Sequence, residues 1–242
     1  MRKCLPLVIL ALVAGCDTVP DWTGNRDKTV FPKAERPVAP IVSSRWSDEE
    51  SRDRQDEAEK IMDLASIAPG MTVADIGAGE GYYTIRLAQR VGAKGRVLAQ
   101  DIVTSVRDNL AERVSRERLD NVSVKLGKPA DPKLPDNSFD RILMVHMYQE
   151  IESPYEFLWR LRPALRPGGR VIVVDANRPT ADHGTPPHLL TCEMGAIGYR
   201  RIQFEEAAFA GGYFTAFEAV GARPESKDII PCTLDGLPAV RP

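Results

Sequence analysis

The sequence predicts an α/β fold in which helices cover both faces of a mostly parallel, doubly wound sheet. Short apolar stretches alternate with helix-like stretches from residue 71 to residue 176, which is typical of consecutive βαβ units. A glycine-rich segment, residues 75–84, follows the first apolar stretch. The last two strand-like stretches, 199–205 and 212–219, are joined by a link too short for a crossover helix. We therefore expect these two strands to pair antiparallel.

A capping motif opens the first predicted helix. Ser47 is followed three residues later by Glu50, and apolar residues recur at helical spacing from Ala58 to Ala65. The pattern predicts a helix over residues 48–66, which ends before a Pro-Gly pair.

The elements that follow alternate regularly. Each predicted strand is a short apolar stretch, and each predicted helix repeats its apolar residues every three to four positions. The expected strands are 71–76, 96–101, 122–126, 139–146 and 170–176, and the expected helices are 82–91, 106–119 and 154–165. A proline-rich loop precedes the fourth strand. With the final pair, the sheet is expected to have seven strands.

The composition is that of one soluble globular domain with extensions. Of the 242 residues, 43% are hydrophobic and 27% are charged, which excludes a disordered or multi-span membrane chain. The net charge of −2 lacks the basic surplus that nucleic-acid binding usually requires, so we predict no nucleic-acid partner. The four cysteines, at positions 4, 16, 192 and 232, show no metal-ligand spacing, so no metal site is predicted. Whether Cys192 and Cys232 form a disulfide stays open at this point.

The amino terminus has the pattern of an export signal. Arg2 and Lys3 precede an apolar stretch, residues 5–14, which is too short to span a bilayer. The alternatives are a signal peptide and a buried helix, and the stretch lacks the polar residues that an amphipathic helix would show at every turn. Removal of residues 1–15 would take away two basic residues and no acidic one, which lowers the net charge from −2 to −4.

The end of the apolar stretch, Val13-Ala14-Gly15-Cys16, resembles the bacterial lipobox, in which a lipidated cysteine follows the cleavage site. The resemblance implies a signal peptide over residues 1–15 and a lipid on Cys16 that attaches the protein to a membrane, facing the periplasm. If the start codon is misassigned, the protein is instead cytoplasmic.

The segment after the signal has no strand or helix period. Four prolines lie between residues 17 and 46 among scattered charges, which is typical of a flexible tether or of a disordered terminus. We therefore divide the chain into a lipidated cysteine and tether over residues 16–46, a folded domain over 47–222 and a tail over 223–242.

The glycine-rich segment is suited to a nucleoside ligand. Glycines 77, 79 and 81 let a ligand approach the backbone closely where a strand meets a helix. The dinucleotide fingerprint G-x-G-x-x-G requires its third glycine at position 82, where this chain has Tyr82, so a dehydrogenase is disfavoured. Asp101 ends the second strand about 20 residues later, where its carboxylate can accept hydrogen bonds from both ribose hydroxyls. Asp75 can face an ammonium group.

The segment Val-Ala-Asp-Ile-Gly-Ala-Gly-Glu-Gly-Tyr-Tyr-Thr, residues 73–84, resembles motif I of the class I S-adenosylmethionine-dependent methyltransferases. Residues 134–140 resemble the family's entry to its fourth strand, and residues 165–170 resemble its turn into the fifth. The resemblance covers about residues 57–220. It implies a Rossmann-like doubly wound sheet of seven strands, mostly parallel with a final antiparallel pair, and S-adenosyl-L-methionine as the cofactor.

The resemblance also implies site residues. Those implied to bind the cofactor surround its methionine, ribose and adenine portions: Asp75, Gly77, Gly79, Gly81, Asp101, Ala130, Asp131 and His146. If the methyl acceptor must lose a proton, His146 or Glu150 is the candidate base, and Tyr148 could orient it. An ordinary polar connection between strand and helix is the alternative for these three residues. The polar residues after the fifth strand belong either to the acceptor pocket or to a surface loop: Asp175, Arg178, His183 and His188.

Two functions from different classes remain. The first is a methyltransferase that acts on a small-molecule acceptor, which the lack of a basic groove favours. The second is a non-catalytic membrane-anchored lipoprotein that uses the same fold as a binding module, because an export signal conflicts with a cofactor made in the cytoplasm. The sequence does not predict an oligomeric state.

Overall fold

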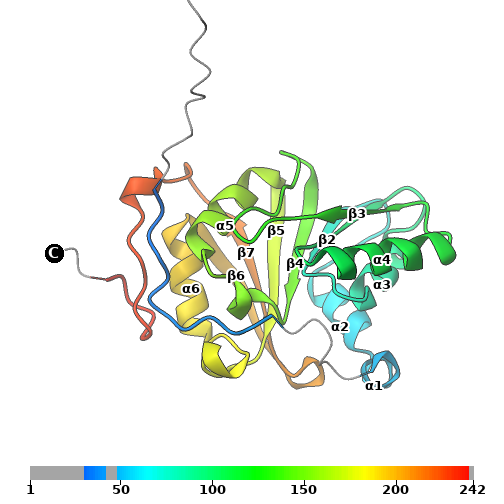
Figure 1. The fold of residues 1–242 in the computed structure, drawn as a ribbon, viewed down its shortest axis with the longest axis horizontal. Coiled ribbons are helices and arrows are strands. Elements are labelled where there is room, and N and C mark those ends of the chain that lie inside the picture. Colours follow the sequence, from blue (N-terminus) through cyan, green and yellow to red (C-terminus); the bar gives the residue numbers. More distant parts are fainter. Residues whose placement is uncertain (1–29, 42–47, 240–242) are drawn as a thin grey trace, which may run out of the picture.

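The computed structural model describes residues 30–41 and 48–239, and a seven-stranded sheet in the order β3-β2-β1-β4-β5-β7-β6 runs through its centre (Figure 1). Strands β1 to β5 are parallel, and β7 lies antiparallel between β5 and β6. The strands are β1 (Thr72–Ile76), β2 (Arg96–Asp101), β3 (Val122–Leu126), β4 (Phe139–Val145), β5 (Leu165–Asp175), β6 (Tyr199–Ala207) and β7 (Gly212–Ala219). The predicted fold class, with its antiparallel final pair, is confirmed.

Helices cover both faces of the sheet. They are α1 (Glu49–Asp53), α2 (Glu57–Leu64), α3 (Tyr82–Val91), α4 (Thr104–Arg116), α5 (Pro154–Leu161) and α6 (Pro187–Ala196). Successive strand residues point to opposite faces, so in β1 Val73 packs in the cluster of α2 and α3, and Ala74 and Ile76 pack in the cluster of α5 and α6. Helix α4 packs on β2 and β3 through Leu110. Apolar residues on both faces of the central strands therefore produce the layered fold.

The predicted helix over residues 48–66 is two helices. Asp56 has a left-handed backbone with φ of 53°, and this turn separates α1 from α2. The amino end of α1 is capped by Asp48, whose carboxylate accepts a hydrogen bond from the backbone N–H of Ser51 at 2.8 Å. The predicted cap, Ser47, lies outside the described residues.

The helices α5 and α6 also differ from the prediction. Helix α5 ends at Leu161, and a single 3-10 turn over Arg162–Ala164 leads into β5. Helix α6 was not predicted at all, since its apolar residues do not form a single stripe, although Pro187 at its first turn is a favoured start.

Residues 30–41, which we call the strap, pack against the domain. The buried Arg36 forms an ion pair with Glu193 of α6, with 3.0 Å between Nε and Oε1. The backbone N–H of Ala39 donates to the carbonyl of Gln149 at 3.1 Å. The prediction of a flexible tether is therefore wrong for residues 30–41, because partners more than 100 residues away hold them. The predicted signal peptide, Cys16 and the rest of the tether lie outside the described residues.

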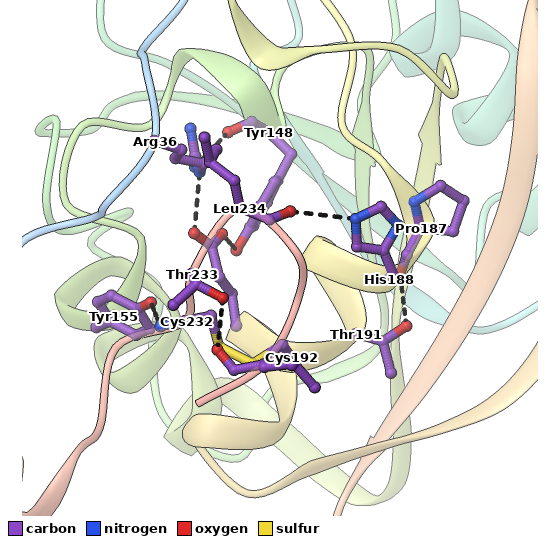
Figure 2. The surroundings of a disulfide bond; sticks show 12 residues. Arg36, Tyr148, Tyr155, Pro187, His188, Thr191, Cys192, Cys232, Thr233 and Leu234 are labelled. Atoms are coloured by element: carbon purple, nitrogen blue, oxygen red, sulfur yellow. Dashed lines mark hydrogen bonds and ion pairs between the residues drawn. A yellow bond between two sulfur atoms is a disulfide. The ribbon is translucent and has the colours of Figure 1, made fainter. Parts of the chain in front are cut away.

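The carboxyl-terminal segment, residues 223–239, is attached to the domain by a disulfide between Cys192 of α6 and Cys232 (Figure 2). The backbone N–H of Cys232 also donates to the hydroxyl of Tyr155 at 2.6 Å. The predicted tail is thus a covering segment of the domain, and the pairing that the sequence left open is present. Among residues 30–41 and 48–239, none of the helices has the length and apolar composition needed to cross a bilayer.

The disulfide closes a loop with a sequence separation of 40 residues. Restriction of the unfolded chain by a loop of this length corresponds to a stabilisation of about 4 kcal/mol in the chain-entropy treatment. We expect the double variant Cys192→Ser/Cys232→Ser to lose a stability of this order in guanidinium unfolding. A reductant should destabilise the wild type and leave the double variant unchanged. Equal stability of the oxidised wild type and the double variant would contradict the expectation.

Candidate active site

A cavity of about 620 Å³ lies at the carboxyl ends of β1, β2 and β4, the position at which doubly wound sheets bind ligands. The glycine loop between β1 and α3 forms one wall, and residues 38–41 of the strap contribute to another. The lining residues include Val38–Ile41, Asp48, Glu49, Arg52, Asp75, Gly77–Glu80, Gln100–Ile102, Pro129, Val145–Met147, Glu150–Glu152 and Phe157.

The glycine loop has a backbone that only glycines adopt readily. Gly77, Gly79 and Gly81 have φ values of 69°, 55° and 92°. A Cβ on Gly77 would lie 2.9 Å from Cγ of Met147, and a Cβ on Gly81 would lie 2.4 Å from Cδ1 of Leu110. Gly77 and Gly79 line the cavity as predicted, whereas Gly81 does not and instead allows α3 to begin close to α4.

Asp101 connects the end of β2 to the glycine loop. One carboxylate oxygen accepts a hydrogen bond from the N–H of Gly79 at 3.1 Å, and the other accepts from the N–H of Val103 at 2.9 Å. Asp101 lines the cavity at the predicted place. Each oxygen keeps a lone pair that could accept a hydrogen bond from a ligand hydroxyl.

Asp75 is the second-last residue of β1, opposite Ala99 of β2, and is almost fully buried. Its carboxylate accepts a hydrogen bond from the Thr84 hydroxyl at 2.6 Å. Burial raises the pKa of Asp75 to about 6, and the Thr84 bond opposes part of this rise. Asp75 therefore carries a charge at neutral pH in a position where a cationic ligand group would compensate its loss of water.

Gln100 is a cavity residue that the sequence analysis missed. Its side chain is 1% exposed and lies against Gly127, where a Cβ would be only 1.5 Å from the amide nitrogen. That amide nitrogen has no hydrogen-bond partner among the described residues. Because an unsatisfied buried donor is destabilising by about 1–3 kcal/mol, Gln100 is suited to a ligand acceptor atom. The sequence signal that could have identified Gln100 as a cavity residue is its position directly before Asp101 at the end of the second strand.

His146 lies at the cavity with a left-handed backbone, φ 54°. Its Nε2 is 2.8 Å from the carbonyl oxygen of Ala210, so this nitrogen carries the hydrogen and donates. Its Nδ1 lies 3.8 Å from a carboxylate oxygen of the fully buried Asp175. In this arrangement Nε2 is not available to take a proton from a methyl acceptor. The imidazole, which follows β4, instead lies against Asp175 at the end of β5.

The other candidate residues separate into two groups. Glu150 lines the cavity, whereas Tyr148 is fully buried below it and donates its hydroxyl to Glu193 at 2.7 Å. Tyr148 therefore cannot orient a base in the cavity as predicted. Ala130 and Asp131 are not lining residues either: Asp131 forms an ion pair with Lys133 at 2.8 Å, and the neighbouring Pro129 lines the cavity instead.

The polar residues at the end of β5 and after it do not line this cavity either. The residues concerned are Asp175, Arg178, His183 and His188. His188 faces a separate hollow beside the disulfide, with its Nε2 3.2 Å from the carbonyl oxygen of Leu234 (Figure 2). In the part of the chain that the structure describes, no three His, Cys, Asp or Glu side chains cluster as a metal site would require.

The strap is the second feature that sequence reasoning missed. Arg36 donates to the carbonyl oxygens of Tyr148, Gln149 and Ile151, at 3.5, 3.4 and 3.3 Å, besides its ion pair with Glu193. These carbonyls belong to the turn that follows β4 and carries Glu150. One buried guanidinium therefore fixes both the strap and the neighbouring cavity wall.

Comparison with known proteins identifies the central part of the chain. Residues 73–169 match the family described as "Methyltransferase domain". An arsenite methyltransferase from Halobacterium salinarum is 30% identical over 155 residues, which are 60% of this chain and 39% of that protein. A ubiquinone/menaquinone biosynthesis C-methyltransferase from Hahella chejuensis is 29% identical over 125 residues, 49% of this chain and 48% of that protein. The chain thus spans less than half the length of these two curated relatives.

Solved structures agree with the domain match. A SAM-dependent methyltransferase from Aquifex aeolicus superposes with a TM-score of 0.61 at 25% identity, over 71% of this chain and 97% of that one. The [4+2]-cyclase SpnF superposes with a TM-score of 0.60 at 16% identity, over 78% of this chain and 100% of that one, which shows the fold alone. The match of residues 73–169 to a methyltransferase domain agrees with the prediction, and the outer boundaries of the domain at residues 47 and 222 stay a prediction.

The raised pKa of Asp75 has a testable effect on stability. In the folded protein Asp75 keeps its proton up to about pH 6, whereas an unfolded chain loses it near pH 4, so stability falls as pH rises through this interval. We expect Asp75→Asn to raise the free energy of unfolding above pH 7 by up to about 3 kcal/mol and to have no such effect below pH 4. Urea unfolding across pH would measure this difference. The exposed Asp235→Asn is the matched control, and an equal gain at all pH values would contradict the assignment.

Proposed function

We propose that this protein is an S-adenosylmethionine-dependent methyltransferase that acts on a small molecule. The observation that carries the proposal is the hydrogen bond between Asp101 and the N–H of Gly79, which sets a ribose-binding carboxylate beside the glycine loop inside the matched domain. The relatives named above act on arsenite or take part in quinone biosynthesis, according to their names, which supports a small-molecule acceptor.

The residues present fit this cofactor. The positive φ of Gly77 and Gly79 leaves an open backbone along the cavity, and the amide nitrogen of Gln100 lacks a partner among the described residues. We assign Asp75 to the cofactor's ammonium group, Asp101 to its ribose hydroxyls, and the end formed by Gln100 and Pro129 to its adenine. When bound, the cofactor supplies a methyl group activated by a sulfonium sulfur.

The chain's own contribution is alignment and exclusion of water. The strap and the turn after β4 form the wall opposite the glycine loop, so an acceptor in the cavity is held against the cofactor side. Where the acceptor must lose a proton, Glu150 is the candidate base, because Nε2 of His146 already donates to Ala210. His146 then acts as a positioning residue for this wall.

The predicted binding module without catalysis has less support. The domain match and the named relatives are methyltransferases, and the cavity contains the glycine loop, Asp75 and Asp101 together. The superposition on a cyclase shows that the fold by itself does not fix the reaction, so cofactor binding is the decisive measurement.

We also propose that residues 1–15 are a signal peptide and that Cys16 carries a lipid which attaches the protein to a membrane, facing the periplasm. The basic pair before the apolar stretch and the lipobox-like sequence carry this proposal. The Cys192–Cys232 disulfide supports it, because disulfides persist in oxidising compartments outside the cytoplasm.

Calorimetry of the full-length protein with S-adenosylmethionine, S-adenosylhomocysteine, adenosine and NAD tests the cofactor. We expect the first two ligands to bind and NAD not to bind. Asp101→Asn should lower the affinity for S-adenosylmethionine, S-adenosylhomocysteine and adenosine about tenfold to a hundredfold. The reason is that the ribose hydroxyls of each ligand lose hydrogen bonds of about 1.5–3 kcal/mol.

Adenosine separates the role of Asp101 at the ribose from its role at the glycine loop, because adenosine lacks the methionine arm that this loop would hold. The exposed Glu205→Gln should change nothing. Unchanged adenosine affinity in Asp101→Asn would remove this carboxylate from the ribose, and absence of binding by the wild type would contradict the proposed function.

Intact-mass analysis of the protein from its native membrane tests the lipid. We expect a chain that begins at Cys16 and carries two or three acyl groups, because one acyl chain attaches a protein only marginally. A Cys16→Ser variant should stay unprocessed and unlipidated. Recovery of wild-type chains that begin at Met1, or that have an unmodified Cys16, would disprove the assignment.

A further inference from the structure

The cavity has a second half beyond the cofactor residues. Since β1 lies between β2 and β4 in the sheet, the residues after β4 and the strap lie across the glycine loop from Gln100 and Asp101. We call this part the acceptor half. It consists of Val38–Ile41, Val145–Met147, Glu150–Glu152 and Phe157, with Asp48, Glu49 and Arg52 of the α1 region beside it.

Negative charge dominates the whole cavity. Seven carboxylate side chains line it, against one arginine, Arg52, among the described residues. The seven are Asp48, Glu49, Asp75, Glu80, Asp101, Glu150 and Glu152. The proposed cofactor accounts for Asp75 and Asp101, so five carboxylates remain for the rest of the cavity.

The cations near the cavity are already matched by carboxylates of their own. Arg52 makes two hydrogen bonds to Glu57, at 2.5 and 3.0 Å, and stacks on the ring of Tyr82. Arg36 is turned inward to Glu193. Nδ1 of His146 lies 3.8 Å from a carboxylate oxygen of the buried Asp175.

Three of the five remaining carboxylates are not matched in the same way. Glu49 is compensated by Arg86 and Arg113. Asp48, Glu80 and Glu152 are exposed and form no ion pair within the described part of the chain. The hydrogen bonds from Ser51 keep the pKa of Asp48 below its usual value, so this carboxylate is ionised at neutral pH. A surplus of negative charge therefore faces the solvent at the cavity mouth.

The acceptor half also offers apolar surface. Val38 and Ile41 of the strap are 39% and 49% exposed, and Ile151 and Phe157 lie on the same cavity. A ligand that fills this half would contact apolar side chains on one part of its surface and carboxylates on another.

We propose that the acceptor half binds small molecules with a positively charged group, such as an ammonium, next to an apolar body, and discriminates against phosphate and carboxylate compounds. This inference rests on the proposed function, since it concerns the acceptor of the same site. An anionic acceptor would meet the carboxylates of Asp48, Glu80 and Glu152, and no unpaired cationic side chain among the described lining residues would compensate its charge. A cationic acceptor would instead regain in the cavity the charge interactions that it loses with water.

Three probes of similar shape test the charge preference: phenethylamine, 3-phenylpropanol and 3-phenylpropanoate. Their binding to the full-length protein saturated with S-adenosylhomocysteine would be measured by ligand-detected NMR titration. We expect phenethylamine to bind at least about tenfold more tightly than 3-phenylpropanoate at low ionic strength, with the alcohol between them. The preference should shrink in 0.5 M salt, because salt screens exposed charges.

The double variant Glu80→Gln/Glu152→Gln, which removes two of the carboxylates without an ion pair among the described residues, should lose most of the preference. The control is Glu205→Gln/Glu206→Gln on strand β6, which removes the same charge from exposed positions outside the cavity and should keep the preference. Thermal unfolding would verify that each variant is folded.

The outcomes separate the two proposals. Absence of S-adenosylhomocysteine binding would overturn the proposed function. Binding of S-adenosylhomocysteine with equal affinity for the three probes, or with a preference for the carboxylate, would overturn the inference about the acceptor. A preference that survives in Glu80→Gln/Glu152→Gln would also overturn its assignment to these carboxylates.

Discussion

The buried ion pair between Arg36 and Glu193 is the contact on which the shape of the candidate site depends. Both side chains are nearly inaccessible, and Glu193 also accepts the hydroxyl of Tyr148. Loss of one partner from such a pair typically lowers stability by about 3–5 kcal/mol, because a charge is left buried without compensation. The guanidinium also binds three carbonyls of the turn after β4, so one residue of the strap sets the position of two cavity walls.

The cofactor side of the cavity shows how function opposes stability in this fold. Asp75 is buried at the end of a strand, where its ionised form lacks water, and Gln100 has a buried amide nitrogen without a described partner. Both features are unfavourable in the free protein and favourable in a complex that supplies a cation and an acceptor atom. A ligand with these groups would therefore fill the cavity and also stabilise the folded protein.

The elements that the sequence predicted well are those with short-range signals. The strands of the sheet alternate or are continuously apolar, the glycine loop has its own spacing, and Asp101 follows at the end of β2. The break at Asp56 was missed because residues 48–57 are all polar, so no apolar pattern marks where α1 ends and α2 begins. Helix α6 was missed because it is apolar on more than one side.

Asp75, Gly77, Gly79 and Asp101 line the cavity as expected, because the backbone alone positions them, and their role in cofactor binding stays a prediction. The observed positions differ from the expected ones where tertiary packing decides. Tyr148 and Glu150 are two positions apart in one turn, yet Tyr148 points to Glu193 and Glu150 to the cavity. The composition of the strap predicts disorder, and its order could not be predicted because its partner residues lie in distant parts of the sequence.

The separation of 157 residues between Arg36 and Glu193 also has a consequence for the order of folding. A chain emerging from its amino end presents the strap first, but the carboxylate that receives Arg36 becomes available only with α6. Contacts of such long range form slowly, since the entropy of closing a long loop opposes them. The core of β1 to β4 can assemble before this closure, whereas Arg36 lacks its ion-pair partner until α6 is present. The ligand cavity is thus completed as one of the final events in the maturation of the protein, after most of the polypeptide has been made.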